Sequence, residues 1–134
     1  MTPMPEEPEW LEERTVRLFH QRQLAEHGGM AGTRDENMLM SALAKPMQLW
    51  CYGSPPPDLC ALGAAYAYGL AKNHPFLDGN KRTAAIACET FLILNGQHFT
   101  VGEEEKYPMY LALAAGDLSE ADFAAWLRDN TAPA

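Results

Sequence analysis

Hydrophobic residues along this chain recur at helical spacing, and no alternating β-branched run is longer than a few residues. Helix-ending signals divide the pattern: Gly28-Gly29 follows the first apolar stretch, Pro46 the second and Asn95-Gly96 the fourth. Asp35 and Ser119 stand where N-caps are expected. The pattern predicts helices over residues 11–27, 36–45, 58–73, 81–95, 103–115 and 120–129.

The helix predicted over residues 81–95 differs from the others because it is apolar almost all the way round. A helix with so little polar surface is generally buried. We therefore predict an all-α fold, a compact bundle of about six helices around this buried central helix. Residues 1–134 are expected to form one domain, because this length suits a single core and no linker divides it.

The remaining segments are predicted to be irregular or short. Residues 46–57 contain four prolines among apolar side chains, so we expect a loop there. Residues 97–101 are expected to form a short extended piece. The Pro-rich residues 1–8 are predicted to be a loose N-terminal arm, and the tail from Thr131 is predicted to be loose as well.

Charge and composition exclude several classes of protein. Acidic residues outnumber basic ones by 18 to 10, and a net charge of −8 argues against direct nucleic-acid binding. The longest mostly apolar stretch, residues 59–71, is shorter than the roughly 20 residues that a membrane span requires. The chain starts without a signal-peptide pattern, and its three cysteines lack paired spacing. We therefore expect a cytoplasmic protein with no membrane association.

The segment NHPFLDGNKRT, residues 73–83, leads into the predicted central helix. Backbone N–H groups at a helix N-terminus lack intrahelical partners and carry the positive end of the dipole, so they can bind phosphate. Gly79 allows close approach of a ligand, and Asn80 can cap the helix or donate its side-chain amide. Lys81 and Arg82 oppose the dipole, where a helix selected only for stability would carry acids. The segment therefore predicts an anion site.

Two further side chains in the same segment suggest chemistry. His74 supplies an imidazole, the side chain most often used as a general base, and Asp78 is a hard oxygen ligand of the kind Mg²⁺ prefers. A base, a metal ligand and a phosphate site are the parts that phosphoryl or nucleotidyl transfer needs. The residues alone leave an alternative open, in which His74 is an ordinary surface histidine and residues 78–80 are an ordinary turn before a helix.

The string HPFLDGNKRTA, residues 74–84, resembles the signature of the Fic/Doc family, which reads HxFx[D/E]GN followed by basic residues. Lysine at position 81, followed by Arg-Thr-Ala, is similar to the Doc (death-on-curing) toxin branch. The resemblance extends from about Leu11 to Asn130. It includes softer matches at residues 27–29, 32–35, 39–46 and 91–96.

The resemblance implies a Fic-like fold and a role for each motif residue. His74 would be the general base that takes a proton from a target hydroxyl, and Asp78 would hold Mg²⁺. Lys81 and Arg82 would bind phosphate oxygens and act in catalysis. The rest of the phosphate site would come from the start of the helix, at Gly79, Asn80 and Thr83.

The resemblance also assigns a role to the predicted loop. Residues 47–54 occupy the place of the family's flap, which clamps an extended segment of the target protein. Trp50 and Tyr52 would then contact the target by strand addition. Ordinary packing of these two aromatic side chains remains the alternative.

The function implied is that of a toxin, a Doc-like kinase that moves the terminal phosphate of ATP or another nucleoside triphosphate to a protein hydroxyl. The family's target type is the translation factor elongation factor Tu, so translation would be inhibited and growth arrested. A cognate antitoxin would neutralise the protein. AMP or other nucleotidyl transfer is an alternative, although Lys81 and Ala85 replace a glycine and a second arginine of the AMP transferases. A non-catalytic binding module is the third possibility.

Overall fold

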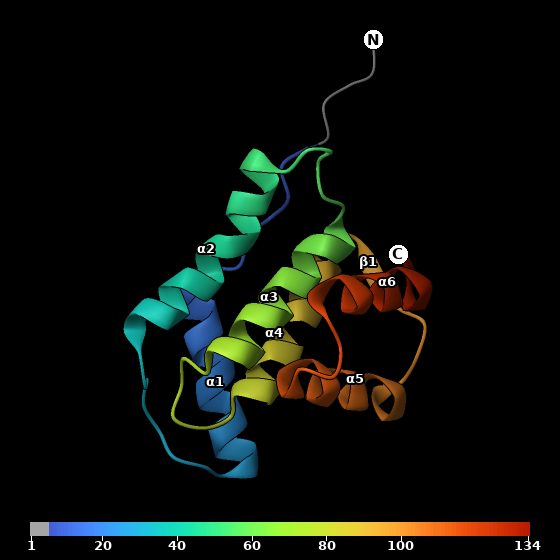
Figure 1. Ribbon diagram of the computed structural model, residues 1–134. Coiled ribbons are helices and arrows are strands. Elements are labelled where there is room, and N and C mark those ends of the chain that lie inside the picture. The colour runs from blue at the N-terminus through green and yellow to red at the C-terminus, as the bar shows by residue number, and fades with distance from the viewer. Residues whose placement is uncertain (1–5) are drawn as a thin grey trace.

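Six helices and one two-stranded sheet make up residues 6–134, the part of the chain that this computed structural model describes (Figure 1). The helices are α1 (Glu13–His27), α2 (Glu36–Tyr52), α3 (Leu59–Asn73), α4 (Asn80–Leu94), α5 (Glu103–Ala115) and α6 (Glu120–Asn130). The strands are β1 (Gln97–Phe99) and β2 (Thr131–Pro133). The predicted all-α class is confirmed, and the helix boundaries agree closely except in α2.

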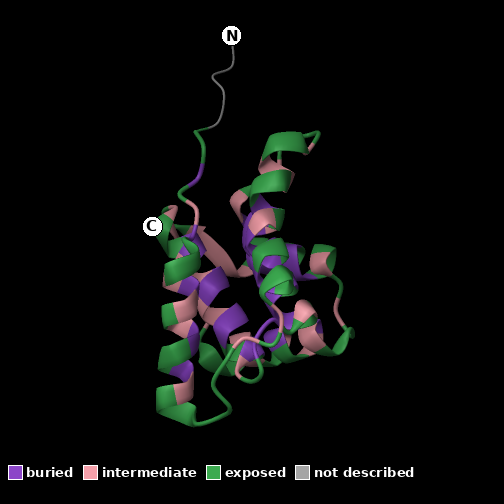
Figure 2. Ribbon diagram, turned by 90° about the vertical axis from the view of Figure 1, so that its left-hand side faces the viewer, coloured by how far each residue is buried: buried purple, intermediate pink, exposed green. Residues whose placement is uncertain are grey.

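The central helix of the bundle is α3, not the helix predicted over residues 81–95. Ten of the 15 residues of α3 are buried, and α2, α4, α5 and α6 all pack against it. Figure 2 shows the buried residues in the interior of the bundle, with the exposed residues on its outside. Small side chains permit this crowding, because a Cβ on Gly69 would lie 3.1 Å from the Ala42 Cβ of α2. In α4 one face packs on α3, but both ends of the helix are exposed at Lys81, Arg82, Ile93 and Leu94.

The prediction that α2 ends at Lys45 is wrong, because the helix continues through Pro46 to Tyr52. A proline inside a helix costs roughly 3 kcal/mol through its missing N–H and its steric clash. Pro46 is itself buried, in line with Leu39, Ala42 and Leu43 on the face that packs against α3. Burial of this apolar face outweighs the local penalty, so the loop expected over residues 46–57 is reduced to the residues between Tyr52 and Leu59.

Both ends of the described chain are held more firmly than predicted. Strand β2 pairs antiparallel with β1, and Ala134 N–H donates to the Gly96 carbonyl at 2.8 Å, so the tail from Thr131 is not loose. Near the start, Pro8 is buried, and Glu9 N–H donates to Asn95 Oδ1 at 2.8 Å. The prediction of a loose N-terminal arm is therefore wrong at Pro8. Residues 1–5 of that arm lie outside the described residues.

Two expectations about the class of protein can be compared with the structure. Across the described part of the chain, every helix is either too short or too polar to serve as a membrane span. Cys51 is exposed, Cys60 and Cys88 are buried, and all three are free thiols. Burial raises the pKa of the Cys88 thiol, so this side chain stays protonated in the core.

Candidate active site

The loop between α3 and α4 brings the chain to the start of α4 with the first backbone amides of that helix open. Gly79 is the N-cap residue, with a φ of +77° that favours glycine, and no described side chain caps the helix. The Asn80 side chain instead closes the loop: its Nδ2 donates to the Phe76 carbonyl at 2.9 Å, and its Oδ1 accepts from the Phe76 N–H at 3.0 Å. The unpaired amides remain available to an anion.

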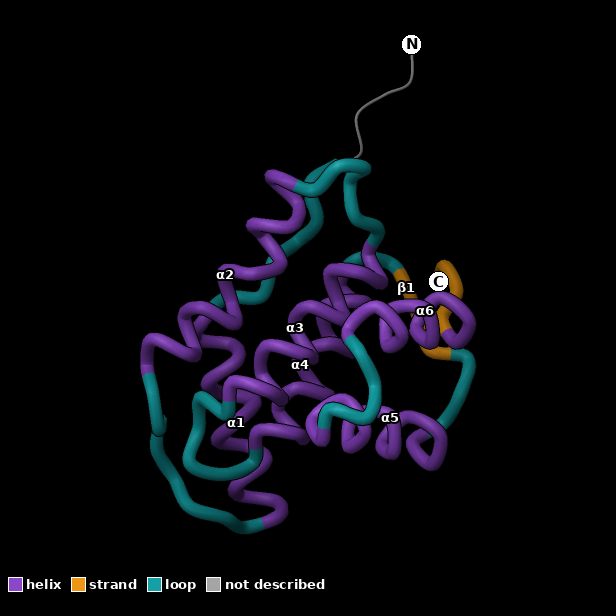
Figure 3. The backbone as a smooth tube through the Cα atoms, in the orientation of Figure 1, coloured by secondary structure: helices purple, strands orange, loops and turns teal. Residues whose placement is uncertain are grey.

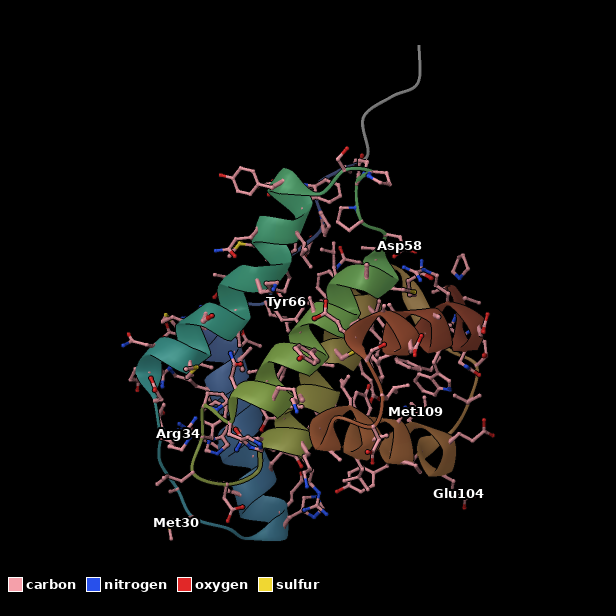
Figure 4. The ribbon with its side chains drawn as sticks, viewed as in Figure 1. Met30, Arg34, Asp58, Tyr66, Glu104 and Met109 are labelled. Carbon is pink, nitrogen blue, oxygen red and sulfur yellow. The ribbon has the colours of Figure 1, made fainter. Side chains whose placement is uncertain are left out.

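His74 stands at the opposite side of the same loop, where α3 ends. It is the C-cap residue of α3, with φ 47° and ψ 56°, a left-handed conformation that non-glycine residues rarely adopt. Arg34 stabilises this turn, because its guanidinium donates to the carbonyls of Asn73 and His74 at 2.6 Å each. Figure 4 shows Arg34 beside this loop. The exposed imidazole of His74 is thus carried on a backbone that Arg34 holds in place.

The connection between α1 and α2 runs alongside the α3–α4 loop and braces it (Figure 3). Thr33 and Phe76 form an antiparallel bridge, and the N–H groups of Arg34 and Asp35 both donate to the Pro75 carbonyl. Leu77 N–H donates to the Gly32 carbonyl at 3.1 Å. These backbone bonds fix the loop from outside, so its shape does not depend on its own short sequence alone.

A buried histidine supports the loop from beneath. His20 of α1 is 5% exposed, and its ring stacks on Phe76 with ring centroids 3.8 Å apart. Its Nε2 lies 2.8 Å from the Asp78 carbonyl oxygen. The imidazole fills the space between α1 and the loop because it offers both a flat apolar face and a polar edge.

These elements enclose a pocket of about 330 Å³, hereafter the phosphate pocket. Among the sequence-predicted site residues, it brings together His74, Asp78, Gly79, Asn80, Lys81 and Arg82. Gly28, Leu77 and Tyr107 complete the lining. Neither Lys81 nor Arg82 forms an ion pair with any described residue, so both cations face the pocket uncompensated.

Thr83 does not reach this pocket through its side chain. It is wholly buried, and its N–H donates to the Gly79 carbonyl at 3.0 Å. Its hydroxyl finds no hydrogen-bond partner among the described residues. A contribution of Thr83 to phosphate binding therefore remains a prediction that the geometry does not favour.

Trp50 and Tyr52 do not lie near His74, and the flap predicted over residues 47–54 is mostly helical. Both residues belong to the last turns of α2, near the start of α3, whereas His74 caps the other end of α3. Asp58, the N-cap of α3, marks that distant end in Figure 4. Trp50 packs edge-on against Trp10, with ring centroids 6.5 Å apart, while Tyr52 is exposed. The segment is thus helical up to Tyr52 instead of a loop, and target binding by Trp50 and Tyr52 stays a prediction.

Asp78 is exposed at the rim of the phosphate pocket and has spare capacity to bind a metal ion. Its Oδ2 accepts from the Met30 N–H at 3.1 Å, and its Oδ1 accepts weakly from the Gly79 N–H at 3.3 Å. A carboxylate offers about four lone-pair positions, so two or more remain. Within residues 6–134, no three acidic, His or Cys side chains are arranged so that they could hold a metal ion by themselves. Proteins often hold Mg²⁺ with one or two carboxylates together with the phosphates of a substrate.

A larger hollow of about 540 Å³ lies at the other end of the molecule, between the N-terminal segment and the start of α3. Its lining includes Glu6, Glu7, Trp50 and Leu62. Its lining contains no lysine, arginine or histidine, and Glu6, Glu7 and Asp58 make it acidic, so it is poorly suited to a phosphate. The smaller phosphate pocket is the stronger candidate for an active site because a histidine, a carboxylate and two cations line it together.

Sequence reasoning missed three residues of the site: His20, Arg34 and Tyr107. Arg34 lies in a segment that matches the family pattern, but its role depends on a contact with residues 73 and 74 that local sequence does not reveal. Tyr107 comes from α5, far along the chain, and its ring lies 6.0 Å from the Arg82 guanidinium carbon. That distance is at the limit for a cation–π contact.

Comparison with known proteins agrees with the site's geometry. The model of the Fic/DOC family matches residues 10–92, which include every lining residue of the phosphate pocket except Tyr107. The chain is 46% identical over 70 residues to a protein named Toxin Doc from Mycolicibacterium smegmatis. That match covers 52% of this chain and 53% of the mycobacterial protein, so it spans about half of each.

A second relative is similar over a longer stretch. The chain is 28% identical over 110 residues to a protein named Protein kinase doc from Escherichia phage P1. This match covers 82% of this chain and 86% of the phage protein. The two comparisons together associate the chain with proteins of the Doc branch.

Proposed function

The chain belongs to the Fic/Doc family, and from that premise we propose that it is a Doc-like toxin with protein kinase activity. It transfers the terminal phosphate of ATP, or of another nucleoside triphosphate, to a hydroxyl group of a target protein. The single observation that carries this proposal is the shared lining of the phosphate pocket. His74, the open amides at the start of α4 and two unpaired cations all face one volume.

The N-terminus of α4 is the proposed site for the triphosphate. Asn80, Lys81 and Arg82 line the pocket, and as the first residues of α4 they have backbone amides without intrahelical partners at the positive end of the helix dipole. The side chains of Lys81 and Arg82 add two positive charges. Fixed donors of this kind stabilise charge that develops on phosphate oxygens during transfer, without a cost of reorientation.

His74 is the proposed general base. Its ring nitrogen accepts the proton of the target hydroxyl as the oxygen attacks the terminal phosphorus. The bond from that phosphorus to its bridging oxygen breaks, and the nucleoside diphosphate leaves. General base catalysis typically contributes about 10² to 10⁴ in rate. Arg34 holds the His74 backbone through two hydrogen bonds and so keeps the ring at the pocket.

Asp78 is the residue that would hold Mg²⁺, since it combines exposure at the pocket with unused lone pairs. Mg²⁺ bound there would neutralise phosphate charge. The Met30 N–H, 3.1 Å from Oδ2, orients the carboxylate toward this position. Lys81 and Arg82 remain free to contact the phosphate oxygens that face the helix.

Nucleotidyl transfer is the competing enzymatic function, because the same pocket would accept the α-phosphate of ATP. Lys81 and Ala85 argue against it, since they stand where AMP transferases of the family have a glycine and an arginine. A non-catalytic binding module is the third candidate. It gives no reason for His74 to share a pocket with unpaired cations.

The proposed biological partners follow from the relatives' names and from the resemblance stated above. A protein named Toxin Doc implies a cognate antitoxin that neutralises it. We propose the same for this chain, together with a translation factor such as elongation factor Tu as the target. The proposed site of action is the cytoplasm.

The reaction is tested by supplying ATP labelled at either the γ or the α position, with Mg²⁺ and a bacterial lysate. We expect the γ label alone to appear on a protein, and we expect His74→Ala to abolish it. Transfer of the α label would establish nucleotidyl transfer instead. If neither label appears on a protein, and if growth arrest persists in His74→Ala, the chain is a binding module.

A further inference from the structure

Arg82 lies at the boundary between the phosphate pocket and a neighbouring hollow of about 440 Å³, which α1, α4 and α5 enclose. Its exposed side chain lines both spaces and forms no ion pair with any residue in 6–134. A long arginine side chain loses much conformational entropy when a ligand holds it in one position. A neighbour that keeps the guanidinium at the pocket in advance reduces that loss and favours phosphate binding.

Two carboxylates in the neighbouring hollow compete for the same guanidinium. Glu89 and Glu103 line this hollow, and Glu89 lies about two helical turns beyond Arg82 on α4. Free carboxylates there would attract the guanidinium away from the phosphate pocket. Lys106 of α5 binds both, at 2.7 Å from Glu89 Oε1 and 3.0 Å from Glu103 Oε1. Lys106 thus weakens their attraction for Arg82.

Tyr107, the next residue of α5, offers the guanidinium a contact of another kind. Its half-buried ring lines both spaces, and the ring centroid lies 6.0 Å from the Arg82 guanidinium carbon. The face of an aromatic ring attracts a cation up to about this distance. The ion pair between Lys106 and Glu89, whose side chains are 11% and 19% exposed, anchors this part of α5 to α4. The ring is therefore held close to the helix that carries Arg82.

From this arrangement we propose that Tyr107 is a positioning residue, whose ring holds the Arg82 guanidinium at the phosphate pocket. This inference rests on the proposed function, because it assumes that Arg82 contacts the phosphates of the nucleotide. Tyr107 acts through Arg82 and takes no part in the chemistry itself. Its removal therefore weakens phosphate binding only while Arg82 is present.

The test measures the binding of inorganic tripolyphosphate, with Mg²⁺, to the full chain by calorimetry, so it does not depend on catalytic activity. Tyr107→Leu removes the ring, and we expect it to weaken binding about two- to five-fold, the range of an exposed cation–π contact. Tyr107→Phe keeps the ring and should bind as tightly as the unmodified chain. In an Arg82→Gln background, Tyr107→Leu should have no further effect, because the contact is already absent. Tyr68→Leu is the matched control, because Tyr68 is exposed on α3 and does not line the phosphate pocket.

The outcomes separate this inference from the function on which it rests. A loss in Tyr107→Leu that appears only when Arg82 is present supports the positioning role. An equal loss in the Arg82→Gln background, as misfolding would also give, or no loss at all, would overturn this role and leave the phosphate pocket intact. A loss in Tyr107→Phe as large as that in Tyr107→Leu would overturn it as well, because the phenol oxygen would then act on the ligand directly. If the unmodified chain does not bind tripolyphosphate, the proposed phosphate site fails, and the role of Tyr107 fails with it.

Discussion

The Nε2 atom of His20 lies 2.8 Å from the carbonyl oxygen of Asp78, a residue 58 positions later in the chain. The same ring stacks on Phe76, and Phe76 is bonded at both its N–H and its carbonyl by the Asn80 side chain. One buried side chain of α1 therefore supports the loop that carries both Asp78 and the start of α4. Any change in this support should alter the phosphate pocket as well as stability.

Replacing His20 by leucine tests that support. His20→Leu leaves the Asp78 carbonyl without its hydrogen bond, and we expect the free energy of unfolding to fall by about 1–3 kcal/mol. ATP should also bind more weakly, because the loop loses its anchor. Urea unfolding and ATP titration measure the two effects. His27→Leu, at an exposed position of the same helix, should leave the unfolding free energy within about 0.5 kcal/mol. An equal loss in both variants would contradict the role given to His20.

His74→Ala separates binding from chemistry. His74 is exposed, so its removal should not change stability, and phosphate binding rests on other groups. We expect ATP affinity to be unchanged and the rate of phosphate transfer to fall about 10²–10⁴-fold. His98→Ala, at an exposed histidine of β1, is the matched control and should retain full activity. A His74→Ala variant that still transfers phosphate at the normal rate would exclude His74 as the base.

Arg34→Lys tests the positioning of His74. The guanidinium bonds two carbonyls at once, and a lysine ammonium cannot reproduce that planar fork. We expect kcat to fall while KM for ATP stays nearly constant, because Arg34 contacts the turn at His74 and is absent from the lining of the phosphate pocket. Steady-state kinetics measure both constants. Arg14→Lys, with its side chain 82% exposed, is the control and should change neither. A rise in KM alone would point to nucleotide binding instead.

Local sequence predicted the helical elements well, because their ends carry strong signals. The Asp58 and Ser119 side chains accept backbone N–H bonds at the starts of α3 and α6. The failures came where long-range packing overrides a local rule. Pro46 continues α2 because its face is buried against α3, and β2 exists only because β1 lies beside it. The choice of central helix failed for a similar reason, since the small residues of α3 let α2, α4, α5 and α6 all pack closely against it.

Only the site residues that lie close together in the sequence could be predicted. His74 and residues 78–82 meet in one pocket because a single loop joins two helix ends, and the motif already implies that arrangement. His20, Arg34 and Tyr107 reach the site from α1, the α1–α2 connection and α5. Their roles depend on how the bundle packs. The loop expected around Trp50 and Tyr52 is absent because both residues belong to the last turns of α2, at the far end of α3 from His74.

The ion pair between Asp58 and Arg128 predicts a pH dependence of stability. Arg128 Nε lies 2.6 Å from Asp58 Oδ2, and this hydrogen bond holds the pKa of the Asp58 carboxyl below its usual value. A lowered folded-state pKa contributes stability above the unfolded value of about 3.9, and that stability is lost as pH falls through the folded value. We expect Arg128→Met to unfold more readily than the unmodified chain near pH 7, by at most about 1 kcal/mol because both side chains are about half exposed. The difference should close below about pH 4. A difference in unfolding free energy that stays constant with pH would contradict this role of the ion pair.

The central claim is that the first amides of α4, beside His74, bind the phosphates of a nucleotide. The most direct test follows the backbone amide resonances of the ¹⁵N-labelled chain during titration with ATP and Mg²⁺. We predict saturable shifts that are largest at Gly79, Asn80, Lys81 and Arg82, with the signals of β1 unchanged. The account would be contradicted if these four resonances kept their chemical shifts while ATP binding reached saturation. It would also be contradicted if they shifted no more than resonances in distant parts of the chain.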